Sequence, residues 1–266
     1  MLCASDHDGE ATALVPWWSF AKTVLATAVL RLVAEGRLAL DDRLARLLQH
    51  RAGLPDYGAL PDYHAAVARG DTPWPAAELL ARLAGRSAPG WRYSNIGYWH
   101  LRELVETTTG TELETVLRSL VAVRLARTPQ DLAGCAWGNA AGYHPGWVYP
   151  GLLLGTPSAA AQFLHRLLTG DLLPADLRAR MVTPFPLGET FPHRPWRSTG
   201  YGLGLMIGEM AGAGLAIGHS GAGPGSVAAV YHFPVHGRSF AAFAQGEDEG
   251  RAEWAVARAM QAASAP

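Results

Sequence analysis

Ser19 and Lys22 stand three positions apart at the start of an apolar run. In a helix this spacing places the hydroxyl and the amine on one face, a single turn apart. A serine at the start of a helix also meets the free amides and the dipole that favour developing negative charge. A lysine made neutral by burial can take the serine proton and activate the hydroxyl as a nucleophile. Alone, the pair also fits a helix cap followed by a surface lysine.

The lysine of this pair is the only lysine in the chain, since the other 21 of the 22 basic residues are arginine. Arginine stays protonated at any working pH, whereas a buried lysine can lose its proton. A coding bias toward arginine explains the 21 arginines. A site that needs a neutral amine explains why Lys22 escaped the exchange.

Two further motifs bring polar groups to a loop and to a strand. Residues 89–95 read P-G-W-R-Y-S-N, a turn that offers the phenol of Tyr93 and the amide of Asn95 just before a helix. Residues 218–222 read G-H-S-G-A and end a strand-like segment. The order S-x-x-K, Y-x-N, H-x-G on helix, loop and strand is much more specific than any one of these motifs.

The elements that must position these motifs follow from the apolar pattern. A buried helix is expected over residues 19–36, and at most one strand, over 11–16, precedes it. The later helices are expected at 42–50, 76–83, 97–109, 112–120, 158–168, 174–181 and 253–263. The strands are expected at 201–207, 215–219, 226–233 and 238–245.

This order of elements predicts an α+β fold with an antiparallel sheet built from both chain ends, flanked by helices, and an all-helical insertion. We expect residues 1–39 and 191–266 to carry the sheet, the nucleophile helix and the H-x-G strand. Residues 40–190 are expected to form a mainly helical domain with the Y-x-N loop.

The composition excludes several classes of protein. With 266 residues, 49% hydrophobic, 17% charged and a net charge of -1, the chain has no basic excess for nucleic acid. Its longest apolar stretch is far shorter than the roughly 20 residues of a membrane span. Residues 1–10 carry acids where a secretory signal has a basic start, and Cys3 and Cys135 lack metal or redox spacing. We expect a cytoplasmic protein without metal or cofactor that binds neither nucleic acid nor membrane.

The three motifs resemble those of the serine penicillin-recognising superfamily, in particular class C β-lactamases, D-alanyl-D-alanine carboxypeptidases and related esterases. The segment 32–42, the turn H-R-A-G-L-P at 50–55 and the strand Y-G-L-G at 201–204 are also similar to segments of that family. The resemblance covers nearly the whole chain from residue 20. It implies a β-lactamase/transpeptidase-like fold that is shortened at its N-terminus, with an open or partner-completed sheet edge.

The resemblance implies a role for each motif residue. Ser19 is the acylated nucleophile, Lys22 its base, and Tyr93 the second base and proton shuttle to the leaving group. Asn95 holds the substrate amide or Lys22, and His219 stands where esterase-like members often have histidine in place of lysine. The backbone amides of Ser19 and Ala222 form the oxyanion hole. Ser220 and Gly221 of the H-x-G strand bind the substrate.

Other notable residues are assigned to structure. Asp248 and Glu249 are expected to be solvated turn acids. Trp17 and Trp18 are expected in the core, although either can line an acyl pocket.

The expected function is a two-step acyl transfer through an acyl-enzyme. The most expected net reaction is hydrolysis of a small ester, and cleavage of a β-lactam or a D-amino-acid amide ranks next. A transacylase would use the same residues with an acceptor other than water. An inactive homologue that binds peptidoglycan or a partner is the alternative of another class, favoured by the short N-terminus and opposed by the intact motifs. The expected partner is a small ester, amide or lactam, and a homo-oligomer is compatible with the open edge.

Overall fold

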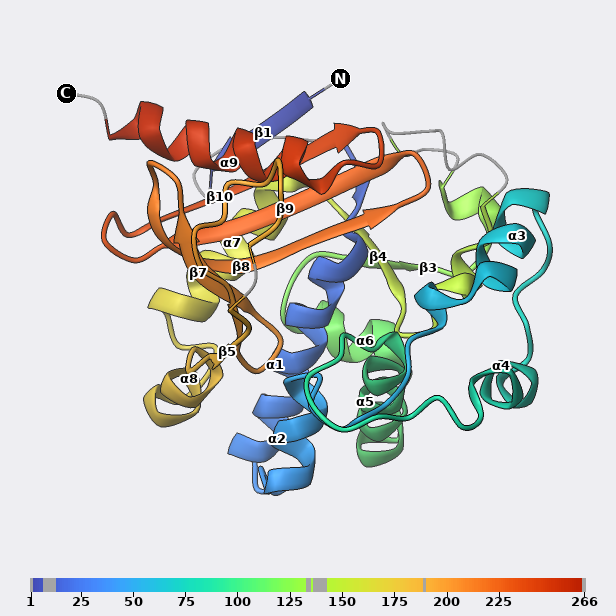
Figure 1. The fold of residues 1–266 in the computed structure, drawn as a ribbon. Coiled ribbons are helices and arrows are strands. Elements are labelled where there is room, and N and C mark those ends of the chain that lie inside the picture. The colour runs from blue at the N-terminus through green and yellow to red at the C-terminus, as the bar shows by residue number, and fades with distance from the viewer. Residues whose placement is uncertain (1, 7–12, 133–134, 136–142, 189, 265–266) are drawn as a thin grey trace.

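An antiparallel sheet of seven strands extends from the top of the molecule down its left side in Figure 1, which shows a computed structural model of the chain. The structure describes residues 2–6, 13–132, 135, 143–188 and 190–264. The strand order is β1-β10-β9-β8-β7-β6-β5. The strands are β1 (Leu2–Asp6), β5 (Phe185–Pro186), β6 (Gly200–Tyr201), β7 (Met206–Met210), β8 (Gly214–Gly223), β9 (Ser226–Phe233) and β10 (Arg238–Gln245).

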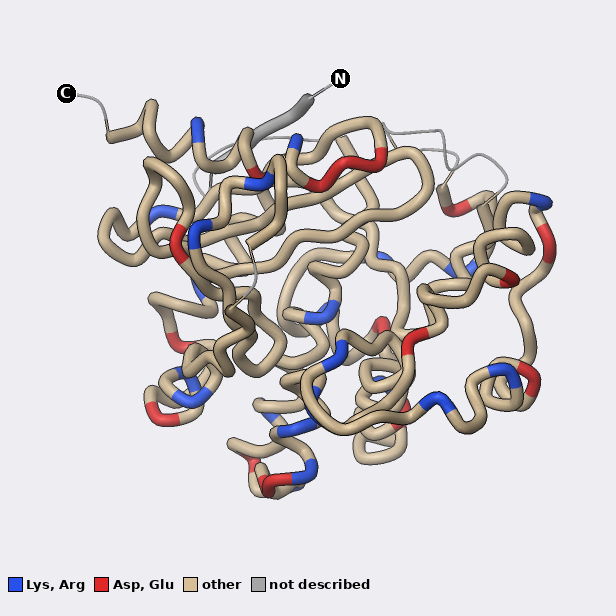
Figure 2. The backbone as a smooth tube through the Cα atoms, in the orientation of Figure 1, with Lys and Arg blue, Asp and Glu red and all other residues tan. Residues whose placement is uncertain are grey.

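The central strands are buried on both faces, which their sequences explain. All eight residues of β9 are buried, and they alternate between two cores. Ala228 and Val230 pack in the core that includes helix α1 (Ala21–Ala34), whereas Val227 and Ala229 face helix α9 (Glu249–Ala263). Figure 2 shows that Asp, Glu, Lys and Arg lie mostly on the surrounding helices and loops rather than on these strands.

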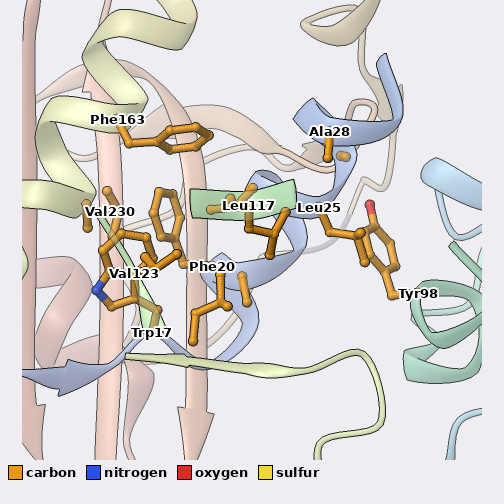
Figure 3. Packing of buried hydrophobic residues seen from close by; sticks show 14 of the residues in the cluster. Trp17, Phe20, Leu25, Ala28, Tyr98, Leu117, Val123, Phe163 and Val230 are labelled. Atoms are coloured by element: carbon orange, nitrogen blue, oxygen red, sulfur yellow. The ribbon is translucent and has the colours of Figure 1, made fainter. Parts of the chain in front are cut away.

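The helix expected at residues 19–36 lies beneath the sheet. A 3-10 turn, η1 (Trp18–Phe20), leads into α1 (Ala21–Ala34), and 11 of the 14 residues of α1 are buried. Phe20, Leu25 and Ala28 point into a core shared with Phe163 and Val230 (Figure 3). Because α1 is covered on nearly all sides, it can hold a buried polar side chain such as Lys22.

The remaining elements form the helical half and the lower flank of the sheet. A second sheet has the order β2-β4-β3, and α7 packs against β9 and β10 of the large sheet. The α-helices are α2 (Asp42–Leu48), α3 (Pro61–Arg69), α4 (Ala76–Leu83), α5 (Asn95–Thr109), α6 (Leu113–Arg118), α7 (Pro157–Thr169) and α8 (Ala175–Met181). The short strands and 3-10 turns are β2 (Val15–Pro16), β3 (Arg124–Ala126), β4 (Leu152–Gly155), η2 (Tyr57–Ala59), η3 (Pro129–Leu132) and η5 (Pro145–Trp147).

Several sequence-based expectations need correction. The insertion is not all-helical, because β3 and β4 lie within it; short apolar runs such as 152–155 fit a buried strand as well as a helix. Two strands precede Ser19 rather than one: β1 pairs with β10, while β2 occupies only the end of the predicted strand 11–16, whose first two residues lie outside the described part.

The expected strand 201–207 is interrupted between β6 and β7. Gly204 has a φ of +82°, and a side chain there would lie 2.4 Å from Ala26 Cβ in α1. Its carbonyl accepts a hydrogen bond from Thr23 Oγ1 at 2.8 Å. The break therefore fastens this edge of the sheet to the nucleophile helix. Within the described residues, no helix combines the length and apolar character of a membrane span.

Candidate active site

Ser19 lies in the 3-10 turn that precedes α1, and two unusual backbone features hold it there. Trp18 has a φ of 41°, a strained conformation for a tryptophan, and its indole Nε1 donates to Ser226 Oγ at 2.9 Å. Strand β8 passes so close that a Cβ on Gly221 would lie 2.4 Å from Ser19 N. Glycine is therefore required where the strand meets the serine.

The structure brings the three predicted groups of the first two motifs together. Lys22 Nζ lies 3.1 Å from Ser19 Oγ, and the Tyr93 hydroxyl donates to the same oxygen at 2.8 Å. Lys22 Nζ also lies 5.0 Å from the centroid of the Tyr93 ring and 5.7 Å from that of Tyr98. One hydroxyl thus contacts an amine and a phenol, as an activated nucleophile requires.

Burial changes the acid-base properties of both partners. Lys22 is 3% exposed, and burial lowers its pKa from 10.5 to about 8. With this pKa the ammonium still predominates at pH 7 and the neutral amine prevails above pH 8, so a lysine that is uncharged at rest stays a prediction. Burial raises the pKa of Tyr93 well above its usual value, so the phenol keeps its proton.

Asn95 is held by an acid that the sequence reasoning missed. Asp56 Oδ1 accepts from Asn95 N at 2.9 Å and from Asn95 Nδ2 at 3.0 Å. Burial raises the pKa of Asp56, while the Asn95 donors and Lys22 oppose that rise. Asp56 thus fixes the orientation of the Asn95 amide, and a substrate-binding role of Asn95 stays a prediction. The sequence L-P-D at residues 54–56 places Asp56 directly after the family-like turn 50–55, but it does not show that Asp56 contacts Asn95.

His219 occupies the inner end of the H-x-G strand. It is 2% exposed, and burial lowers its pKa to about 3, so the ring is neutral. Its Nδ1 donates to the carbonyl of Ser220, which fixes Nε2 as the acceptor of the Tyr201 hydroxyl at 2.8 Å. Both ring nitrogens therefore have protein partners. This geometry fits a residue that positions Tyr201 better than one that exchanges protons, and a catalytic His219 stays a prediction.

A buried histidine at the turn 50–55 supports the Tyr93 loop. His50 Nδ1 accepts from Ser94 N at 3.1 Å, and its ring lies 4.3 Å from that of Tyr93 and 4.7 Å from that of Tyr201. Burial lowers the pKa of His50 well below its usual value, so its ring too is neutral. We infer that this contact keeps the phenol in reach of Ser19.

A cluster of charged side chains, Arg194, Glu249 and Glu253, lies next to the H-x-G strand. It corrects the expectation that residues 248 and 249 are both solvated acids. Asp248 caps α9 through Gly250 N, but Glu249 accepts from Arg194 Nη1 at 2.8 Å instead of standing in solvent. Arg194 also contacts Glu253 through Nε at 2.7 Å and Nη2 at 2.5 Å. Its Nη2 donates to Ser220 Oγ at 2.9 Å.

Two pockets meet at Ser19, and Asn95 and Ala222 also line both of them; we call them the first and second lobes of the site. The first lobe, about 750 Å³, has an aromatic wall of Trp18, Tyr57, Tyr63 and Tyr143. Trp18 thus lines the pocket, whereas Trp17 is fully buried in the core. The second lobe, about 660 Å³, is lined by Tyr93, Tyr201, His219, Ser220, Arg194 and Glu249. The site therefore has room on both sides of a bond attacked by Ser19.

A serine contacted by an amine and a phenol, between a buried helix and the middle strand of an antiparallel sheet, defines the class of penicillin-recognising serine proteins. The chain belongs to the β-lactamase family, whose model matches residues 10–263. It is thus placed in the serine β-lactamase-like hydrolase superfamily. No curated protein sequence matches this chain.

Solved structures share the fold over nearly the whole chain. A D-stereospecific amidohydrolase from Streptomyces sp. has a TM-score of 0.74 at 23% identity, covering 99% of this chain and 94% of that one. The D-amino acid amidase from Ochrobactrum anthropi SV3, complexed with L-phenylalanine, has a TM-score of 0.77 at 20% identity, covering 98% and 93%. An octameric penicillin-binding protein homologue from Pyrococcus abyssi has a TM-score of 0.72 at 18% identity, covering 95% and 66%.

Proposed function

We propose that the protein is a serine hydrolase that cleaves small esters and amides through an acyl-enzyme on Ser19. The observation that carries this proposal is the single hydroxyl that lies 3.1 Å from Lys22 Nζ and 2.8 Å from the Tyr93 hydroxyl. D-Amino-acid amides join simple esters as substrates to test, because two of the solved structures with this fold are named D-stereospecific amidohydrolase and D-amino acid amidase.

The chemistry divides between the two partners of Ser19. Lys22, with its pKa lowered to about 8 by burial, accepts the Ser19 proton as the hydroxyl attacks the carbonyl. Tyr93, which keeps its proton, donates to the leaving oxygen or nitrogen as the bond breaks. Water then attacks the ester of Ser19, and its proton returns through the same groups. The backbone amides of Ser19 and Ala222 are proposed to bind the developing oxyanion.

The proposed reaction is tested by covalent labelling and turnover. A fluorophosphonate is expected to add to Ser19 in intact-mass spectrometry, and Ser19→Ala to abolish both the adduct and the hydrolysis of a p-nitrophenyl ester. D- and L-phenylalanine amide, tested beside a β-lactam, define the substrate class. An unlabelled Ser19 in the folded protein would favour the inactive binding homologue, and turnover that survives Ser19→Ala would show another nucleophile.

A further inference from the structure

Two lobes around one nucleophile impose a direction on the substrate, if the acyl-enzyme proposed above forms. Tyr93 must reach the leaving atom to give it a proton. Tyr93 lines the second lobe, with Tyr201 and Met206 nearby. The leaving group therefore occupies this lobe, and the acyl group faces the aromatic wall of the first lobe.

The second lobe has a cation that is already neutralised. Among the described residues that line it, Arg194 is the only lysine or arginine, and Asp56 and Glu249 are the acids. The guanidinium binds Glu253 with two of its nitrogens and Glu249 with the third. Glu253 is fully buried, and the Arg194 side chain is 15% exposed. The arginine therefore has little charge or donor capacity left for a substrate anion.

The cluster of Arg194, Glu249 and Glu253 carries no net positive charge in either state of Glu249. With Glu249 ionised, Arg194 faces two carboxylates, and the cluster carries a net negative charge. Burial raises the pKa of Glu249, which Arg194 opposes, and if Glu249 takes up a proton the Arg194 and Glu253 charges still cancel. His219 adds no positive charge, because its ring is neutral. A carboxylate entering this lobe would lose its hydration without gaining a free arginine, and Lys22, the other nearby cation, lines the first lobe.

We propose that Glu249 and Glu253 set the specificity of the site by neutralising Arg194, so that it accepts uncharged leaving groups and rejects those that bear a carboxylate. Primary amides and simple esters, which release ammonia or an alcohol, fit this lobe. C-terminal peptide bonds and β-lactams, whose leaving nitrogen lies one carbon away from a carboxylate, do not fit it.

Two esters of phenylacetic acid test the proposal, one of glycolamide and one of glycolate, since they differ in the leaving group mainly by its charge. The readouts are kcat/KM and the concentration that protects Ser19 from a fluorophosphonate. We expect the wild-type protein to prefer the glycolamide ester by about tenfold or more, the scale of one unpaired charge at a partly buried site.

With Glu249 ionised, Glu249→Gln changes the cluster from net negative to neutral. It is expected to reduce this preference several-fold, mainly by improving the glycolate ester, without reversing it, because Glu253 still neutralises Arg194. Glu247→Gln is the matched control, because it makes the same charge change two residues away but lines the first lobe. It is expected to leave the preference unchanged, and melting curves of both variants report whether they fold.

Equal use of the two esters by the wild-type protein, or an equal effect of Glu247→Gln and Glu249→Gln, would overturn the specificity proposal while Ser19 chemistry stands. If neither ester is turned over, the same comparison is made on protection of Ser19 from the probe. If folded protein shows neither turnover nor labelling of Ser19, the proposed function fails, and this inference fails with it.

Discussion

Lys22 is buried for the sake of its chemistry and at the expense of stability. Removing an ammonium from water is unfavourable, and the lowered pKa of about 8 reflects that cost. Asp56 and Glu249 oppose the shift by their charge. The result is an amine that is still mostly protonated at pH 7 but that can be deprotonated at a pH near the physiological range.

We predict that kcat/KM for an uncharged ester rises with pH and reaches half its plateau near pH 8. Only the neutral amine accepts the Ser19 proton, and the ammonium form of Lys22 dominates below its pKa of about 8. Initial rates with a p-nitrophenyl ester across this range give the profile. A midpoint near the ordinary pKa of histidine, about 6.5, would point to a histidine as the base.

Lys22→Met is predicted to abolish hydrolysis and to raise the free energy of unfolding at pH 7. A shift of the pKa from 10.5 to about 8 corresponds to a cost of about 3 kcal/mol below pH 8. The variant is expected to recover up to about that amount, measured by urea unfolding. The wild-type protein should become more stable between pH 8 and 10.5, because its unfolded state then holds more protons, and the variant should lack this rise.

Strand β8 and the turn η1 act as one unit, because the strand contacts Ser19 through a glycine. Gly221→Ala would place a Cβ 2.4 Å from Ser19 N and must move one backbone away from the other. We predict a loss of kcat of about 100-fold or more, the scale seen when an oxyanion donor is displaced. Steady-state kinetics and fluorophosphonate labelling measure this effect.

Gly36→Ala provides the control for that variant. Gly36 has a φ of +70° at the end of α1, and nothing lies within 4 Å of a Cβ built there. Alanine should cost about 1 kcal/mol of stability through backbone strain alone and leave the activity intact. A Gly221→Ala variant with full activity would show that the close contact does not position the nucleophile.

Local spacing predicted part of the site. The three-residue interval of Ser19 and Lys22 predicts their contact on one helix turn, and the fold adds Tyr93 from 74 residues away. Asp56 stayed unassigned because its partner, Asn95, lies 39 residues further along the chain. Glu249 looks like a loop acid until its contact with Arg194, 55 residues earlier, is known. No local pattern carries such pairings.

The α+β class and the antiparallel sheet from both chain ends follow from the sequence and are confirmed by the fold. The outer strand β1 was harder to predict, because it belongs to the large sheet only through its pairing with β10. The division into residues 1–39 with 191–266 and residues 40–190 stays a prediction; within the second part, α7 packs on the large sheet. A homo-oligomer also stays a prediction.

The whole molecule is predicted to lose stability as the pH falls below 6.5. The unfolded chain protonates His219 near its ordinary pKa of 6.5, whereas the folded chain does so only near 3, so the unfolded state gains protons first. This difference amounts to about 2 kcal/mol between pH 6.5 and pH 5. His50, whose pKa is also lowered by burial, adds to it.

Urea unfolding at pH 7 and pH 5 measures this loss, and His219→Asn should reduce the difference between the two pH values by about 2 kcal/mol. His236→Asn is the control, since His236 lies exposed on the turn between β9 and β10. An unchanged difference in His219→Asn would mean that this ring is not kept neutral by the fold.

The burial of the chain's only lysine also bears on chemical modification. Reagents that acylate side-chain amines can react with no lysine except the one 3.1 Å from Ser19 Oγ. Among side-chain amines, a small activated ester is therefore expected to modify only the one beside Ser19, whereas amine-reactive dyes and crosslinkers too large for the cavity should leave Lys22 untouched. Surface attachment of this enzyme is better directed to its carboxylates or to cysteines introduced on the helices.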